Sequence, residues 1–87
     1  MGNEGIEIRV ERMHRLGGEG PLKGFADISV AGTFLIKGLR IVSGKEGLFV
    51  SMPQEQGKNG RWYNTVDLLN KALKEKLAGI VLSAYEE

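Results

Sequence analysis

Cysteine is absent from this chain of 87 residues, and it contains only one histidine and two prolines. Without cysteine there can be no disulfide and no thiolate metal ligand. The single histidine, His14, leaves too few ligands for a metal centre and only one base to activate a serine. No apolar run approaches the roughly 20 residues that a membrane-spanning helix needs. We therefore expect no enzyme, no metal or other cofactor, no small-molecule substrate and no membrane span.

The chain is also short. A chain of this length buries only about 60–65% of the surface that its unfolded state exposes, so we expect a single domain over residues 1–87 with a thin core. Small domains without disulfides often gain stability by pairing with a second copy, which favours a homodimer. The amino-terminal stretch MGNEGIEI lacks the basic and apolar segments of a signal peptide, so we expect a cytoplasmic protein.

Positive charge is concentrated in the last third of a chain whose net charge is only +1. Residues 58–85 carry five basic and two acidic side chains, and Trp62 and Tyr63 lie among them. Basic groups interleaved with aromatic rings suit a polyanion with bases that can stack, such as DNA or RNA. A solvated helix face and a protein-binding aromatic pair are the alternatives. The candidate nucleic-acid contacts are Lys58, Arg61, Lys71 and Lys74.

The first half of the chain has the pattern of antiparallel strands. Apolar and charged residues alternate from Ile6 to Val10, and a similar alternation runs from Leu22 to Val30. The glycine-rich segment 16–21 is typical of a turn and does not match the spacing of a phosphate-binding loop. A third apolar run, Phe34–Val42, contains Gly38, and a glycine inside a strand indicates a bulge or a bend.

The segment GKEGLFVSMP, residues 44–53, predicts a hairpin: glycines bound a short link, and a return strand ends at Pro53. Residues 54–60 are polar with two glycines and predict a mobile loop, whereas the aromatic and β-branched residues 61–66 predict a short strand. The sequence thus predicts an α+β fold, with a small antiparallel sheet of about five strands and one carboxyl-terminal helix.

That helix is predicted from an apolar stripe with helical spacing, which consists of Leu69, Leu73, Leu77, Ile80 and Ala84. Asn64 and Asn70 can each cap the helix start, and we favour Asn70 because the residues around Asn64 suit a strand. Glu86 and Glu87 oppose the helix dipole, so we expect the last turn to fray.

Residues 39–53, LRIVSGKEGLFVSMP, resemble the signature of the stage V sporulation protein G family, also called septation protein SpoVG. The resemblance continues in EIRVERM at 7–13, ADISVAGTFLI at 26–36 and VLSAYEE at the end of the chain. It runs without gaps from about Gly20 to Tyr85. It implies a small β-sheet with a carboxyl-terminal helix, a dimer formed through strands, and a cytoplasmic regulator of septation and sporulation that binds DNA or RNA.

The signature contains no reactive constellation, so we assign it an architectural role in the core or in the dimer contact. In this interpretation the glycines permit a backbone reversal with positive φ, and the arginine bonds a carboxylate across the dimer. The residues assigned to this role are Arg40, Gly44, Gly47, Leu48, Phe49, Val50, Met52 and Pro53.

The chain departs from the family pattern directly after the signature. Relatives usually carry a basic S-K-R-T-P loop there, whereas this chain has Gln54, Glu55, Gln56, Gly57 and Lys58. Two expected cations are therefore missing, which weakens the prediction of nucleic-acid binding. The alternative function is a protein-interaction module in cell-division regulation, in which Trp62, Tyr63 and an exposed strand edge bind another protein.

Overall fold

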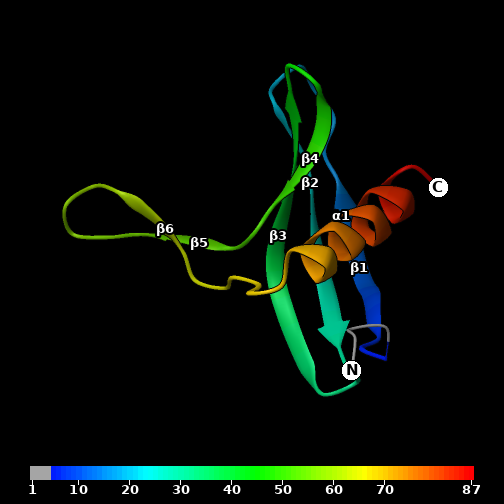
Figure 1. Ribbon diagram of the computed structural model, residues 1–87. Helices are drawn as coiled ribbons and strands as arrows, with labels where there is room; N and C mark the ends of the chain where they lie inside the picture. The colour runs from blue at the N-terminus through cyan, green and yellow to red at the C-terminus, as the bar shows by residue number, and fades with distance from the viewer. Residues whose placement is uncertain (1–4) are drawn as a thin grey trace.

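A computed structural model describes residues 5–87, so the first four residues of the stretch MGNEGIEI lie outside it. Four strands form an antiparallel sheet in the order β1-β2-β3-β4, and two short strands form a separate ribbon (Figure 1). The α+β architecture expected from the sequence is confirmed. The elements are β1 (Ile8–Arg15), β2 (Leu22–Val30), β3 (Phe34–Gly44), β4 (Gly47–Ser51), β5 (Gln54–Gln56), β6 (Trp62–Asn64) and α1 (Lys71–Tyr85).

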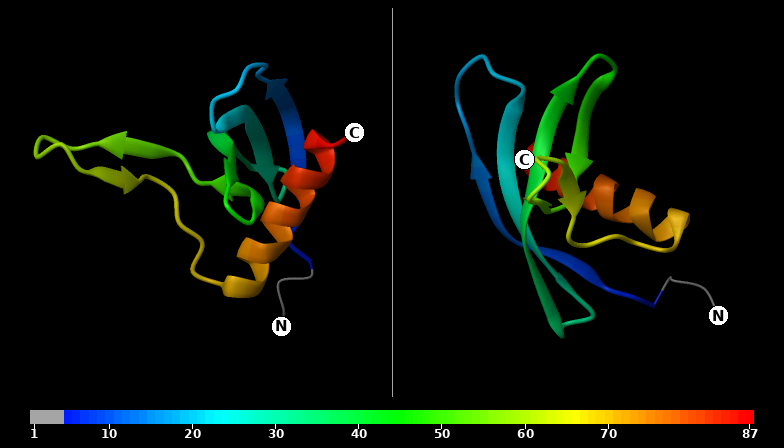
Figure 2. Two further views of the ribbon diagram at one scale, coloured as in Figure 1. Left: turned by 90° about the horizontal axis from the view of Figure 1, so that it is seen from above. Right: turned by 90° about the vertical axis from the view of Figure 1, so that its left-hand side faces the viewer.

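The core lies between α1 and one face of the four-stranded sheet. The helix crosses this face and contacts both outer strands, β1 and β4 (Figure 2). Because side chains alternate between the two faces of a strand, alternate residues of β2, and of β3 on either side of Gly38, point toward the helix. The buried apolar residues are Ile8, Ala26, Ile28, Leu39, Ile41, Met52, Leu73, Leu77 and Val81.

The bend predicted at Gly38 is present. Gly38 has a φ of 83°, and the pairing register between β2 and β3 shifts at this point. The carboxylate of Asp27 accepts a hydrogen bond of 3.1 Å from the Gly38 backbone N–H, which satisfies a donor that the bulge removes from the ladder. The bulge changes which residues face the helix, so that Ile36 packs toward the core before it and Leu39 after it.

Asn70 caps the helix, as the sequence predicts. Its side-chain oxygen accepts a hydrogen bond of 3.0 Å from the backbone N–H of Leu73. The assignment of Leu69 to the apolar stripe is wrong, because Leu69 precedes the cap and is fully exposed. The buried stripe consists of Leu73, Leu77 and Val81, which follow one another at four-residue spacing.

The carboxyl-terminal turn of α1 is held against β1, in contrast to the fraying expected from Glu86 and Glu87. The guanidinium of Arg15 donates hydrogen bonds to the carbonyl oxygens of Tyr85, at 3.0 Å, and Ala84, at 2.8 Å. It also lies over the ring of Tyr85, 5.8 Å from the centroid. Arg15 therefore supplies the positive charge that the end of the helix lacks in its own sequence.

Residues 54–60, predicted to be a loop, instead begin a second hairpin. Gln54–Gln56 pairs with Trp62–Asn64, and the two strands pair only with each other. The strands are joined at the base, where Pro53 accepts a backbone hydrogen bond of 2.8 Å from Thr65. This ribbon, residues 53–65, projects from the body of the molecule and is called the arm below (Figures 1 and 2).

No helix within residues 5–87 is both long and apolar enough to cross a bilayer.

Gly24 gives a direct test of the packing between β1, β2 and α1. A Cβ atom at Gly24 would lie 2.7 Å from the carbonyl oxygen of His14 and 3.5 Å from the ring of Tyr85. Gly24→Ala should therefore lower the free energy of unfolding by about 1–3 kcal/mol, measured by urea denaturation. Gly20→Ala is the matched control, because nothing lies within 4 Å of that position. Equal stability of the two variants would contradict the packing described here.

Candidate nucleic-acid and partner-binding surfaces

The signature hairpin of β3 and β4 is built around two glycines with different roles. Gly47 has a φ of 117°, which confirms the expected positive φ at the turn. Gly44 does not have one; a Cβ there would approach the Phe49 ring to 3.0 Å, so its role is to leave room for that ring. Met52 is part of the buried core, and Leu48 and Val50 are partly buried and pack against that core.

The sheet face opposite α1 is partly apolar and exposed, and we call it the open face. Phe49 lies directly opposite Val42 in the β3–β4 pairing, and Val42 lies opposite Leu22 in the β2–β3 pairing. Phe49 is 48% exposed and Leu35 is 54% exposed. This face could not be predicted from local sequence, because the same apolar residues could equally have belonged to the core.

Arg40 lies on the open face and connects it to the arm. Its guanidinium lies over the Trp62 ring, 5.8 Å from the centroid, which is a cation–π contact. The carboxylate partner that the sequence suggested for Arg40 across a dimer stays a prediction. Trp62 is still 55% exposed and Tyr63 49% exposed, so both rings are accessible along the arm.

Lys58 and Arg61 are exposed at the tip of the arm. The tip is a tight turn in which Gly60 has a φ of 82°, and Gly57 donates a backbone hydrogen bond of 2.8 Å to Arg61. Asn59 donates a hydrogen bond of 2.8 Å to the Tyr63 hydroxyl group, which fixes that ring beside the turn. The tip therefore presents two cations next to an oriented aromatic ring.

Lys71 and Lys74 are exposed in the first turn of α1, three residues apart and hence on neighbouring positions of the helix surface. No acidic residue lies in this turn. The amino-terminal end of a helix carries partial positive charge, so lysines here lose dipole stabilisation and the site favours an anion. All three views place this turn well apart from the tip of the arm (Figures 1 and 2). Within one chain, the four predicted cations thus form two separate pairs.

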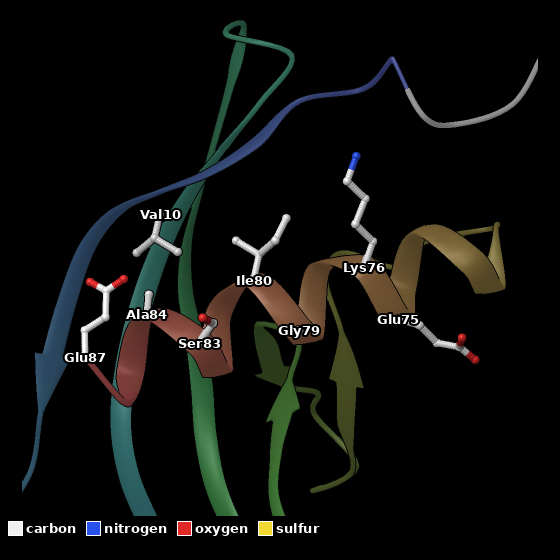
Figure 3. A pocket seen from close by; sticks show the side chains of 8 residues that line it. All are labelled: Val10, Glu75, Lys76, Gly79, Ile80, Ser83, Ala84 and Glu87. Atoms are coloured by element: carbon white, nitrogen blue, oxygen red, sulfur yellow. The ribbon is translucent and has the colours of Figure 1, made fainter.

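A shallow groove of about 610 Å³ separates α1 from the edge strand β1. Val10 of β1 and Ile80 and Ala84 of α1 line the same space, and Gly79, which has no side chain, follows Ile80 along the helix toward Lys76 (Figure 3). Lys76 lies toward one end of the groove and Glu87 toward the other (Figure 3). No local sequence pattern predicts this groove, because its shape depends on how the helix lies across the sheet.

An acid pair that could perform proton transfer would be the sign of an enzyme. Glu11 and Asp27 line one shallow pocket together with Arg12 and Lys37. Both carboxylates have structural partners: Glu11 accepts a hydrogen bond of 2.6 Å from the Ser29 hydroxyl group, and Asp27 holds the β3 bulge. In the described part of the chain, no three potential metal-ligating side chains gather in one cluster.

Comparisons with known proteins point to one family. The SpoVG family model matches residues 4–87. A septation protein SpoVG from Archaeoglobus fulgidus is 35% identical over 81 residues, which cover 93% of this chain and 95% of that protein. A septation protein SpoVG 1 from Listeria monocytogenes is 33% identical, with 93% of this chain and 79% of that protein covered.

Proposed function

This chain belongs to the SpoVG family, and from this premise we propose that it is a cytoplasmic, homodimeric regulator of septation or sporulation that binds the phosphate backbone of nucleic acid. The names of the relatives support the role in septation. The observation that carries the nucleic-acid part is the exposure of two cation pairs: Lys58 with Arg61 on the arm, and Lys71 with Lys74 on α1.

The positions of these cations favour an anionic ligand. Lys71 and Lys74 add charge to the positive end of a helix, an arrangement that costs stability in the free protein and becomes favourable when a phosphate binds. On the arm, Lys58 and Arg61 lie beside Tyr63, whose ring can stack on an unpaired base while the cations contact the backbone.

A homodimer is proposed for two physical reasons. A small domain without disulfides often gains stability by pairing with a second copy. Doubling also matters for binding, because four cations give weak attraction, whereas two copies can neutralise about six to eight phosphates.

The experiment that tests this function is a binding titration with a variant in which Lys58, Arg61, Lys71 and Lys74 are all alanine. At low salt we expect the wild type to bind labelled DNA or RNA and the variant to lose at least about a hundredfold in affinity, because up to eight phosphate contacts disappear from the dimer. Gel shift and fluorescence anisotropy both measure this loss.

The matched control removes four other cations, Arg12, Lys23, Lys37 and Lys45, and thus has the same net charge as the test variant. We expect this control to retain most of the affinity. If the two variants bind equally weakly, only the overall charge matters and the proposed contacts are wrong. No binding by the wild type at low salt would remove the nucleic-acid function altogether.

The exposure of Trp62 and Tyr63 favours a second candidate, a protein-interaction module in cell-division regulation. In that case Trp62→Ala abolishes capture of a protein partner, and nucleic-acid binding is absent from wild type and variant alike.

A further inference from the structure

Residues 6–10, which comprise the first three residues of β1 and the two residues before it, form an outer edge that is suited to strand pairing. The backbone carbonyl of Glu7 faces β2, where it accepts a hydrogen bond of 2.7 Å from Ala31. The carbonyl of Ile6 accepts a hydrogen bond of 3.1 Å from the Lys76 side chain instead. Because backbone groups alternate in direction along an antiparallel strand, those of Ile6, Ile8 and Val10 face away from β2.

We propose that this edge pairs with the same edge of a second copy, antiparallel and with the two-fold axis passing between the two Ile8 residues. The sequence Ile-Glu-Ile-Arg-Val at 6–10 is self-complementary about its centre. In this register Glu7 lies opposite the partner's Arg9, and Arg9 lies opposite the partner's Glu7. Ile6 lies opposite the partner's Val10. Opposite charges directly across a pair of strands stabilise the pairing, and like charges destabilise it.

Neighbouring registers are less favourable. A two-fold axis at Arg9 places two arginines opposite each other and sets Glu7 against the partner's Glu11. An axis at Glu7 places two glutamates opposite each other. The register of β1 shifts between Val10 and Arg12, and such a bulge interrupts regular pairing. The bulge therefore limits the pairing segment to about the five residues that are self-complementary.

The groove beside β1 fits the same arrangement. A two-fold axis perpendicular to the sheet keeps both helices on one face, so the apolar residues Val10, Ile80 and Ala84 of the two copies meet across the axis. The same rotation exchanges the two ends of the groove. The side chain of Lys76 lies near Ile6, to whose carbonyl oxygen it donates a hydrogen bond, and Glu87 lies at the end of the groove near Val10. Because Ile6 pairs with the partner's Val10, the rotation brings Lys76 toward the partner's Glu87. The sheet edge and the helix layer thus favour the same two-fold arrangement, the first through opposite charges and the second through apolar contacts and opposite charges.

This inference rests on the homodimer of the proposed function and is independent of nucleic-acid binding. A perpendicular axis keeps the first turns of both helices on one side of a continuous eight-stranded sheet. The arms, which leave the body beyond β4, then lie at the two ends of that sheet (Figure 1). The cation pairs of the two copies consequently spread along an extended surface.

The test uses two charge reversals, Glu7→Arg and Arg9→Glu, with sedimentation or light scattering to measure the dimer dissociation constant at low salt. Each variant alone places two like-charge pairs across the axis. We therefore expect the dissociation constant of its dimer to be at least about tenfold higher than that of the wild type. An equimolar mixture of the two variants restores both opposite-charge pairs, because one chain then carries two arginines and the other two glutamates. We expect the mixture to form a heterodimer with affinity near that of the wild type.

Lys45→Glu and Glu46→Arg are the control reversals, since both residues are exposed in the β3–β4 turn, outside the segment 6–10. Neither they nor their mixture should change dimerisation. A dimer that is unaffected by Glu7→Arg and Arg9→Glu, or not restored on mixing, would overturn this pairing but leave the proposed homodimer intact. A wild-type protein that is monomeric at high concentration would overturn both.

Discussion

Raising the salt concentration from about 50 to about 200 mM is expected to weaken nucleic-acid binding by about 10³- to 10⁴-fold. The reason is that a dimer that neutralises about six to eight phosphates releases a similar number of counterions, giving a slope of log affinity against log salt of about −5 to −7. Fluorescence anisotropy with a labelled duplex and a labelled single strand, each at several salt concentrations, measures this slope.

The slope also tests the separate contributions of the two cation pairs. Replacing Lys58 and Arg61 by alanine removes four cations from the dimer, as does replacing Lys71 and Lys74. Each double variant should therefore flatten the slope by about 3 to 4. If only one double variant changes the slope, the other pair does not contact phosphate. A wild-type slope shallower than about −2 would leave too few contacts for the proposed surface.

Leu77→Ala is expected to lower the free energy of unfolding by about 2–5 kcal/mol, a large share of the roughly 5–15 kcal/mol that stabilises a small domain. Leu77 is only 2% exposed and lies between two other buried residues of α1, Leu73 and Val81. Truncation leaves a cavity between the helix and the sheet, which the surrounding strands can fill only in part. Urea denaturation followed by circular dichroism measures the loss.

Leu69→Ala is the matched control, because it removes the same atoms from a residue that is fully exposed. Its free energy of unfolding should stay within about 0.5 kcal/mol of the wild type. A comparable loss in both variants would mean that Leu69 is covered in solution, for example by a second copy.

Much of the four-stranded sheet could be predicted from local sequence. Residues Leu22–Val30 alternate cleanly, and the structure has β2 over the same range. Gly38 identified the bend in β3, and Asn70 identified the first turn of α1, because both residue types have strong local preferences. These features depend on a few neighbouring residues, and sequence patterns report such features well.

Features that depend on distant residues could not be predicted. Gln54–Gln56 is polar and suggested a loop; it forms a strand because Trp62–Asn64 returns beside it, and Gln54 donates a side-chain hydrogen bond of 2.8 Å to Asn64 across the pair. Leu69 fitted the helical spacing but lies before the cap. The hydrogen bonds from Arg15 to the last turn of α1 reach Ala84 and Tyr85, which are 69 and 70 positions further along the chain, so no local sequence pattern contains them.

The same long-range contact affects how the protein folds during its synthesis. The face of the sheet that becomes the core stays uncovered until α1 docks, and the docking contacts join β1 to residues as late as Tyr85. The ribosome must therefore synthesise and release α1 almost to its end before the helix can pack against the sheet. Nascent chains that stop before α1 would expose Ile28 and Ile41 to solvent, and such chains are natural substrates for chaperones and proteases.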